Sequence, residues 1–391
     1  MQDVSSENAS GQREWSADEL IPFGKYILLD RISSGATAAV YRANVRGEAG
    51  FERLVAIKRI LPHMAGDRDF VDTFVREAKT VAKLAHEGIC PIYELGKVGE
   101  SLYMAIEYIQ GCDLGRITRR LQGLEQGMPP LIAAWIAARL CDALDYAHTL
   151  KNARGTRTGV IHRDISPSNI MLSFEGQVRL LDFGLAKAVG RAQSTNVDAL
   201  KFKIGYMSPE MVKGRPLDAR SDLFAVGVCL YEMLTGRRLF AGKNDIETIT
   251  LVGKAQVPPP SAVMEDAPEE LEQVILHALQ REPDERYQTA AEMSEALNTY
   301  IQHADPTFGP QRIIGFLRGL FDQEIADEQA RVKVLLAASN DPALIAARRT
   351  FFASATGAAA RARAETEKQV ARERGTLPQS VRAPAPAPVS I

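Results

Sequence analysis

The chain has 391 residues, of which 46% are hydrophobic and 25% are charged, and its formal net charge is −2 at pH 7. This length and composition indicate a soluble globular protein with a core of about 250 residues plus extensions. The low net charge provides no overall field that would attract nucleic acid or an anionic membrane, so we expect neither as a partner.

The cysteines and the apolar runs predict a reducing, cytoplasmic setting. The four cysteines are widely spaced and form no Cys-x-x-Cys pair that would suggest zinc. We therefore expect buried, reduced thiols at Cys90, Cys112, Cys141 and Cys229. The polar N-terminal region lacks the apolar core of a signal peptide. The longest apolar run, residues 223–231, is far shorter than the ~20 residues that a membrane span requires.

The pattern of the chain predicts a flexible lead over residues 1–25, with regular structure beginning near Tyr26. From there to residue 108, short β-like runs surround a single helix-like stretch at residues 70–85. After Gly111 the pattern changes to long apolar helices punctuated by proline and glycine, ending near residue 303. The expected strands are residues 26–29, 39–43, 54–60, 92–96 and 102–108, and the clearest later helices are residues 131–149 and 222–235.

Residues 32–40, ISSGATAAV, lie between two of the β-like runs, in the place of a glycine-rich hairpin. Such a loop covers nucleotide phosphates with backbone N–H groups, and small residues let the backbone come close. One of the usual three glycines is present, and serine and alanine at the other two positions are still small. An ordinary tight hairpin is the alternative. The nucleotide interpretation assigns contacts to Ile32, Ser33, Gly35, Ala38 and Val40.

Residues 55–58, VAIK, predict an alternating strand whose last residue, Lys58, faces the same cleft as Val40 and Ala56. A strand lysine is usually just solvated. Here, however, the one strong helix of this region carries Glu77 beside an apolar face. A carboxylate from that helix would fix Lys58 on the α- and β-phosphates of a nucleotide.

Residues 162–169 read HRDISPSN and residues 182–184 read DFG. With the preceding motifs, and in this order and spacing, they make residues 26 to about 303 resemble the Hanks-type serine/threonine protein kinases, in a bacterial version. Further motifs that carry the resemblance are SPE at residues 208–210, Asp222 with Gly227, and Arg286. The resemblance implies an α+β, bilobal fold: a small antiparallel sheet lobe with one helix over residues 26–108, and a larger, mainly helical lobe over residues 109–303.

The same resemblance implies transfer of the γ-phosphoryl group of ATP to serine or threonine hydroxyls of protein substrates, with autophosphorylation. Asp164 suits the group that orients the acceptor hydroxyl and accepts its proton. Magnesium, or manganese in its place, prefers oxygen ligands and keeps waters, so Asn169 and Asp182 suffice beside phosphate oxygens. Adenine is expected to bond backbone groups at Glu107 and Ile109, behind a gatekeeper at Ile106 and above an apolar floor at Met171.

The catalytic segment departs from the family at Ser166, where most relatives have a lysine that contacts the γ-phosphate. Losing a charged hydrogen bond there costs about 1.5–3 kcal/mol, or roughly ten- to a hundredfold in rate. The second departure is Lys203, where the family normally has a threonine. We hypothesise that Lys203 reaches back to put its ammonium where the missing lysine would have put its own, with Ser166 making room. The alternative is a solvated or substrate-facing cation.

Residues 182–210 correspond to the activation segment and include Ser194 and Thr195. Arg163, next to the catalytic aspartate, marks kinases whose loop is ordered by phosphorylation, so a phosphate on either residue would pair with it. The alternative is that both are ordinary loop residues.

Three scaffold residues complete the resemblance. It implies a buried ion pair between Glu210 and Arg286, and a hold by Asp222 on the backbone of residues 162–163.

Two other function classes compete with an active kinase. A pseudokinase scaffold would bind nucleotide and partners without efficient transfer, and the eroded glycine loop and Ser166 favour it. Against it, the five residues that transfer requires are all present: Lys58, Glu77, Asp164, Asn169 and Asp182. A small-molecule phosphotransferase is disfavoured by the SPE motif and Arg286, which build a peptide-binding platform.

Residues 304–341 predict an amphipathic helical extension that packs on the large lobe or on another copy of the chain, or that serves a regulatory partner. Residues 342–391 are rich first in alanine and arginine and then in proline and alanine, so we expect a disordered tail. The apolar positions at helical spacing are Ile314, Leu317, Phe321, Ile325, Val332 and Leu336.

Overall fold

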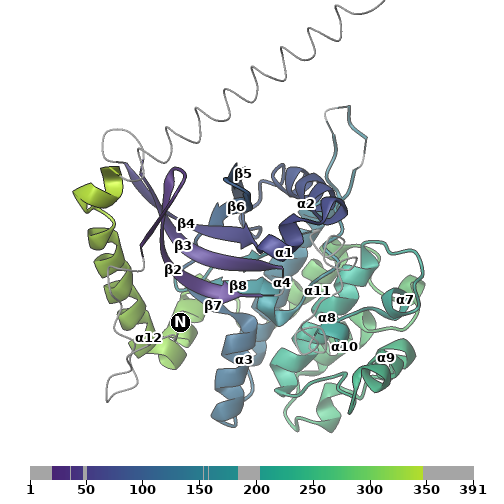
Figure 1. Cartoon of the computed structure of the whole chain (residues 1–391). Coiled ribbons are helices and arrows are strands. Elements are labelled where there is room, and N and C mark those ends of the chain that lie inside the picture. The colour runs from purple at the N-terminus through teal and green to yellow at the C-terminus, as the bar shows by residue number, and fades with distance from the viewer. Residues whose placement is uncertain are drawn as a thin grey trace, which may run out of the picture.

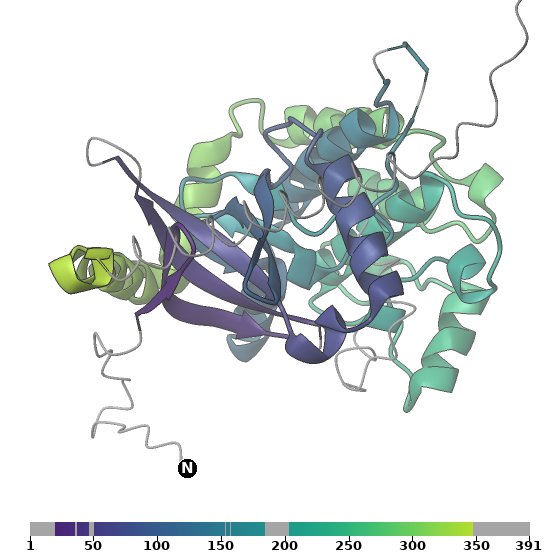
Figure 2. The same cartoon turned by 45° about the horizontal axis from the view of Figure 1, so that its top comes forward.

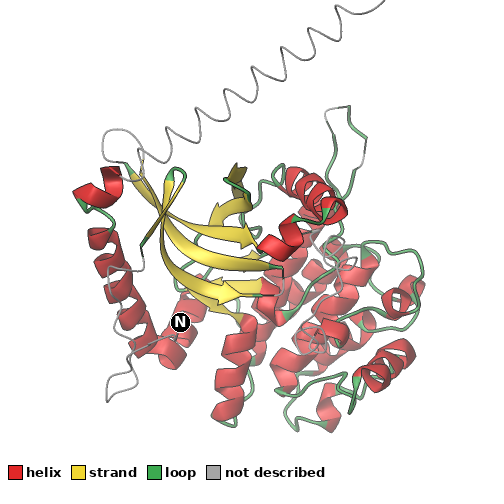
Figure 3. Ribbon diagram, viewed as in Figure 1, coloured by secondary structure: helices red, strands yellow, loops and turns green. Residues whose placement is uncertain are grey.

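The computed structural model describes residues 20–35, 37–46, 51–152, 154–156, 158–183 and 203–346. A sheet-rich small lobe stands on a helical large lobe, as Figures 1 and 3 show. The predicted bilobal α+β fold is confirmed.

The small lobe holds, within the described residues, a six-stranded antiparallel sheet in the order β1-β2-β3-β4-β6-β5. Helix α2 packs Phe70, Phe74 and Ala78 on this lobe, and the side chain of Asp67 caps it by accepting from Phe70 N. The elements are β1 Ile21–Phe23, β2 Tyr26–Ser34, β3 Ala38–Arg46, β4 Glu52–Ile60, α1 Pro62–Ala65, α2 Arg68–Val81, β5 Ile92–Val98 and β6 Ser101–Glu107.

Two details of the small lobe differ from the sequence prediction. Regular structure begins with β1 rather than near Tyr26, because Phe23 pairs with Tyr26 across a tight turn and packs edge-on against Tyr103. Gly24 makes that turn at a φ of +59°, a conformation that glycine adopts without strain. The lobe also has a second, short helix, α1, which Pro62 begins at a position where proline is favoured.

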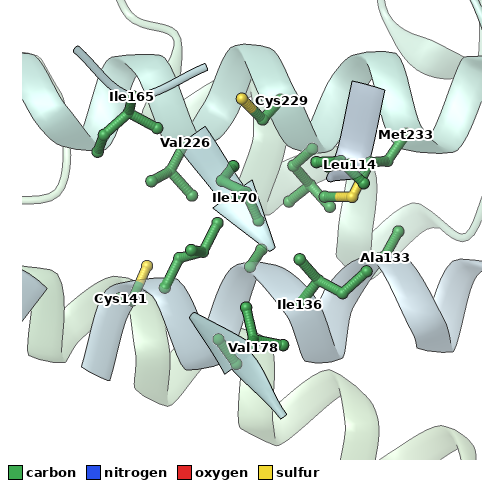
Figure 4. Close-up of a cluster of buried hydrophobic side chains, with 14 of the residues drawn as sticks. Leu114, Ala133, Ile136, Cys141, Ile165, Ile170, Val178, Val226, Cys229 and Met233 are labelled. Atoms are coloured by element: carbon green, nitrogen blue, oxygen red, sulfur yellow. The ribbon is translucent and has the colours of Figure 1, made fainter. Parts of the chain in front are cut away.

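The large lobe is built around helices α4 and α8, whose side chains are buried along most of their length. Figure 4 shows Ala133, Ile136 and Cys141 of α4 gathered with Val226, Cys229 and Met233 of α8 around Ile170 and Val178. Its elements are β7 Gly111–Asp113, α3 Leu114–Gly123, α4 Pro130–His148, β8 Ile170–Ser173, β9 Val178–Leu180, α7 Pro209–Val212, α8 Arg220–Thr235, α9 Asp245–Lys254, α10 Glu269–Ala278 and α11 Ala290–Ala304.

The small sheet β7-β8-β9 sits in this core, and β8 follows directly on the HRDISPSN segment. The loop that carries the predicted catalytic residues is therefore anchored at its C-terminal end in the core of the large lobe. Such anchoring favours a rigid site. The four cysteines are buried and free, as predicted.

Helix α12, Pro310–Ala338, lies within the segment predicted as an amphipathic extension and packs on its own chain. Its buried positions differ from the prediction at the two ends, where Ile313 and Leu335 take the places expected of Ile314 and Leu336. Phe321, with φ −137° and ψ 25°, interrupts the helical geometry, so one helical period does not fit both halves. Among the described residues, no helix is long and apolar enough to cross a membrane.

Candidate active site

Asp222, at the start of α8, holds the catalytic loop by its backbone. Its carboxylate accepts hydrogen bonds from His162 N and Arg163 N, each 2.8 Å long, and lies 2.8 Å from His148 Nε2. Only 1% of Asp222 is exposed, so these bonds are shielded from water. Arg163 has a φ of +67°, which is strained for a residue with a side chain. The two bonds to Asp222 hold the backbone of residues 162 and 163, as predicted.

Asp164, next along the loop, is held by an amide and an ammonium. Asn169 Nδ2 donates to both Asp164 O, at 2.7 Å, and Asp164 Oδ2, at 2.9 Å. Lys203 Nζ lies 2.5 Å from the same Oδ2. The structure thus brings together Asp164, Asn169 and Lys203, three of the residues that the sequence singled out. Ser166 is buried, and its hydroxyl lies 3.1 Å from that of Ser168.

Asp182 joins this group through the backbone. Leu181 N donates to Asn169 O at 2.8 Å, and Leu181 O lies 2.8 Å from His162 Nε2, which fixes the residue before Asp182. The φ of Asp182 is +56°, a second strained position. Lys58 Nζ donates to Asp182 Oδ2 at 2.6 Å. Although burial acts to raise the pKa of Asp182, the charge and hydrogen bond of Lys58 hold it below its ordinary value.

The donor set fits a divalent cation that keeps water and phosphate ligands. The amide nitrogen of Asn169 is committed to Asp164, which leaves its oxygen as the ligand atom. The carboxylate of Asp182 is kept ionised by its lysine. One amide and one carboxylate match the few protein ligands that magnesium takes beside phosphates. In the described part of the chain, no cluster of three or more His, Cys, Asp or Glu forms an all-protein metal cage.

The predicted pairing of Lys58 with Glu77 is absent from this structure. Lys58 bonds Asp182, and among the described residues no ion pair links it to Glu77. Burial raises the pKa of Glu77, and the charges that act against this rise come from Arg163 and Arg76. Lys58 is thus the counter-charge of Asp182 rather than of Glu77. The position of α2 in this structure leaves Glu77 without that role.

The residues predicted to face the nucleotide, Val40, Ala56, Lys58 and Ile106, lie on one face of β3, β4 and β6. We call this face the roof of the predicted nucleotide site. Residues opposite each other in a sheet share a face, and so do residues two apart along a strand. Val40 lies opposite Lys58, and Ala56 lies opposite Ile106, so all four point to one face. In the loop before β3, Gly35 N donates to Ala38 O at 2.9 Å. Ile32 and Ser33, on β2, are exposed to solvent.

The connector between the lobes has its backbone groups partly committed. Glu107 N donates to Pro91 O at 3.2 Å, so the carbonyl of Glu107 is the group left for adenine. That carbonyl accepts only a weak bond from Cys90 Sγ at 3.8 Å. Ile109 follows in the connector, and Met171 lies on β8 opposite Asp113. Both are half-buried.

Phe183 and the Glu210–Arg286 pair are both buried, and the ion pair is the one that the sequence predicted. Phe183 is buried in the cluster that includes Val81 of α2, and its ring centroid lies 4.5 Å from that of His162. Arg286 donates to Glu210 Oε1 at 2.9 Å and Oε2 at 2.8 Å, and both side chains are buried. Ser221 also donates to Glu210. Burial acts to raise the pKa of Glu210, but these bonds and the guanidinium charge lower it to about 2.

The prediction about Ser194 and Thr195 lies outside the described residues, as does Gly184 of the DFG motif. The sequence analysis missed three residues that meet at the edge of the roof: Arg42, Tyr108 and Glu328. Their charges and hydroxyl carry no motif. An arginine two residues after Val40 on the same strand was the available signal, because it shares the face of the roof.

The sequence and the fold of this chain are similar to those of known proteins. The sequence model of the protein kinase domain matches residues 26–299. The tyrosine-protein kinase MasK of Myxococcus xanthus is 39% identical over 317 residues, which are 81% of this chain and 49% of MasK. The serine/threonine-protein kinase PknL of Mycobacterium tuberculosis is 34% identical over 280 residues, 71% of this chain and 66% of PknL.

The serine/threonine-protein kinase PknB of Mycobacterium leprae is 36% identical over 276 residues, 69% of this chain and 42% of PknB. The chain thus spans about two fifths to two thirds of the length of these curated relatives. Among solved structures, the PknI kinase domain of Mycobacterium tuberculosis aligns with a TM-score of 0.55 and 26% identity, covering 71% of this chain and 96% of that domain.

Proposed function

Because the chain belongs to the protein kinase domain family, we propose that it transfers the γ-phosphoryl group of ATP to serine and threonine hydroxyls of proteins, itself included. One observation carries the proposal: Asn169 holds the Asp164 carboxylate through its side chain and the residue before Asp182 through its backbone. A proton acceptor and two metal ligands therefore form one hydrogen-bonded unit. A scaffold without transfer would not need that unit.

The residues divide the work of transfer as follows. Asp164 orients the acceptor hydroxyl and takes its proton, while Asn169 holds the carboxylate in place. Lys58 leaves Asp182 to hold the α- and β-phosphates, and Asp182 with the oxygen of Asn169 binds magnesium or manganese. When bound, the metal neutralises charge on the phosphate oxygens. The shared face of Val40, Ala56 and Ile106 covers adenine.

Serine and threonine specificity is supported by relatives named serine/threonine-protein kinases, PknL and PknB. The similarity to MasK, which is named a tyrosine-protein kinase, supports tyrosine as the acceptor instead. Ser166 weakens the assignment to serine and threonine, because the lysine that it replaces is the usual mark of the serine/threonine kinases. We also propose a reducing, cytoplasmic setting, which four buried free thiols fit.

The test is autophosphorylation with radiolabelled ATP and magnesium or manganese, followed by acid hydrolysis and separation of the phosphoamino acids. We expect phosphoserine and phosphothreonine in the wild type and no label in Asp164→Asn. Phosphotyrosine alone would contradict the assigned specificity. Absence of any Asp164-dependent label with either metal would overturn transfer and favour the scaffold.

We further propose that Lys203 replaces the lysine that the family carries at position 166. Its ammonium lies 2.5 Å from Asp164 Oδ2, beside the proton acceptor, while the buried Ser166 fills little space. Lys203→Ala is therefore expected to lower kcat by about ten- to a hundredfold, the effect of losing one charged hydrogen bond. Steady-state kinetics with a peptide substrate measures it, and Lys213→Ala, at an exposed lysine just after the activation segment, is the matched control.

The double variant Lys203→Ala/Ser166→Lys returns an ammonium from the family's usual position and should recover part of the lost rate. Because Ser166 is buried, the thermal unfolding of Ser166→Lys alone must first show that the longer side chain is accommodated. Full activity in Lys203→Ala, or no recovery in a folded double variant, would show that Lys203 is only a neighbouring cation.

A further inference from the structure

Helix α12 is packed into both lobes. Figures 1 and 2 show it running from the large lobe along the β2–β3 side of the small sheet. Its first half lies in the core of the large lobe, through Ile313, Leu317, Phe321 and Ile325. Its last turns pack Leu335 against Leu20, Ile27 and Leu29 of the small lobe. A single helix thus bridges the two lobes.

A group of two buried and two half-buried charges lies where α12 passes the small sheet and the connector. Arg42 Nη2 of β3 donates to Glu328 Oε1 at 2.5 Å, and the hydroxyl of Tyr108 donates to the same oxygen. Arg331 donates to Asp30, whose other oxygen lies 3.6 Å from Arg42 Nε. Asp30 and Arg42 are each only 4% exposed. The two acidic and two basic side chains balance in charge, so each depends on its partners for burial.

Glu328 joins three parts of the molecule: the helix α12, the sheet and the connector. Arg42 lies opposite Ala56 in the sheet, on the face that forms the roof of the nucleotide site. Its guanidinium carbon lies 4.9 Å from the centroid of the Tyr108 ring, and Tyr108 follows Glu107 in the connector. Burial and the bond to Glu328 raise the pKa of Tyr108, which therefore remains a neutral donor. The carboxylate thus ties the roof to the connector at the edge of the adenine site.

We propose that Glu328 is a positioning residue for ATP: by holding Arg42 and Tyr108 together, it sets the separation of the roof from the connector. The inference rests on the proposed nucleotide site and extends it to a helix outside residues 26–299, the range matched by the kinase family. A site held open at the correct separation does not spend binding energy on closing. Loss of Glu328 is expected to weaken ATP binding while sparing the chemical step, because Asp164 and its partners lie in the large lobe.

The test compares Glu328→Gln, Tyr108→Phe and the double variant. We expect the Kd and KM for Mg–ATP to rise about tenfold in Glu328→Gln, the effect of losing a charged hydrogen bond, with kcat at saturating ATP near that of the wild type. The double variant should add little to the larger single effect, because Glu328→Gln takes the charge from the same bond that Tyr108→Phe removes. Glu324→Gln is the matched control: it lies one turn earlier on α12 and pairs at 3.2 Å with Arg120 of α3, within the large lobe.

Amide hydrogen exchange of residues 107–110, measured without nucleotide, gives a second readout that does not depend on ATP. Exchange should be faster in Glu328→Gln and Tyr108→Phe and unchanged in Glu324→Gln. If Glu328→Gln fails to fold, Tyr108→Phe, which removes only a hydroxyl, decides the matter. Wild-type exchange and ATP affinity in both variants would overturn the inference. A wild type that binds no Mg–ATP would instead refute the proposed function, and the exchange result would still decide whether Glu328 holds the connector.

Discussion

Replacing Asp164 by asparagine is expected to lower kcat by about 10²–10⁴-fold, the usual contribution of a positioned general base. Asparagine has the same shape and keeps an oxygen that can accept from Asn169 Nδ2, so the loop should remain in place. The change removes the negative charge that attracts the proton of the acceptor hydroxyl. Steady-state kinetics at saturating Mg–ATP measures the loss, and the KM for ATP should change little because Lys58 and the roof are untouched.

The free energy of unfolding of Asp164→Asn should stay within about 1 kcal/mol of the wild type, because its ion pair with the partly exposed Lys203 contributes little to stability. Asp322→Asn, the same substitution at an exposed position of α12, controls for the chemical change alone. An Asp164→Asn variant that keeps more than a tenth of the wild-type kcat would show that another group accepts the proton.

Arg286→Ala is expected to lower the free energy of unfolding by about 3–5 kcal/mol, because it leaves the Glu210 carboxylate buried without its counter-charge. The guanidinium makes two bonds to Glu210 and further bonds to the carbonyls of Gln280, Arg281 and Arg220. Urea unfolding followed by circular dichroism measures the loss. Arg220→Ala is the control. The carboxylates of its ion-pair partners, Asp218 and Asp284, are exposed, so this change should lower the free energy of unfolding by about 1 kcal/mol or less.

The same pair predicts how stability depends on pH. The folded-state pKa of Glu210, about 2, lies below its ordinary value of 4.5. The stabilisation by ionised Glu210 is therefore complete above about pH 4.5 and is lost as the pH falls toward 2, amounting to about 3 kcal/mol. Unfolding free energies measured between pH 6 and pH 2 should show this loss in the wild type and much less of it in Arg286→Ala. Equal pH dependence in the two proteins would contradict the assigned role of the pair.

Contacts that belong to motifs were predictable from the sequence. The Glu210–Arg286 pair and the hold of Asp222 on the catalytic loop follow from motif order, because each motif brings its long-range partner with it. Helix α12 was predictable for another reason: its apolar residues recur at helical spacing over many turns.

The partner of Lys58 was not predictable in the same way. Lys58, on β4, bonds Asp182, and a bond to Glu77 instead would require a different position of α2. The position of α2 is decided by the packing of Phe70, Phe74 and Ala78 against the sheet rather than by residue spacing. The sequence therefore specifies the two candidate carboxylates without specifying which one the lysine takes.

The charges around Glu328 were hidden for a third reason. Glu328 and Arg42 are 286 residues apart, and Glu328 stands among other charged residues that resemble a solvated face. Apolar side chains that recur at helical spacing indicate which face of a helix is buried, whereas a buried ion pair has no regular spacing in the sequence. Such pairs become visible only when the two surfaces are brought together in space.

Gly111 limits the hinge between the two lobes to a short segment of the connector. A Cβ there would lie 2.0 Å from Leu172 O, so the backbone of β7 is pressed directly onto β8, and Phe174 N donates to Gln110 O at 2.9 Å. From Gln110 onward the connector moves with the large lobe, and Glu107 still belongs to the small sheet. Tyr108 and Ile109 remain as the residues whose backbone dihedrals must absorb any rotation between the lobes. Opening of the cleft should thus be a hinge motion with four torsion angles, and the first residue of that hinge is the one whose hydroxyl is bonded to α12.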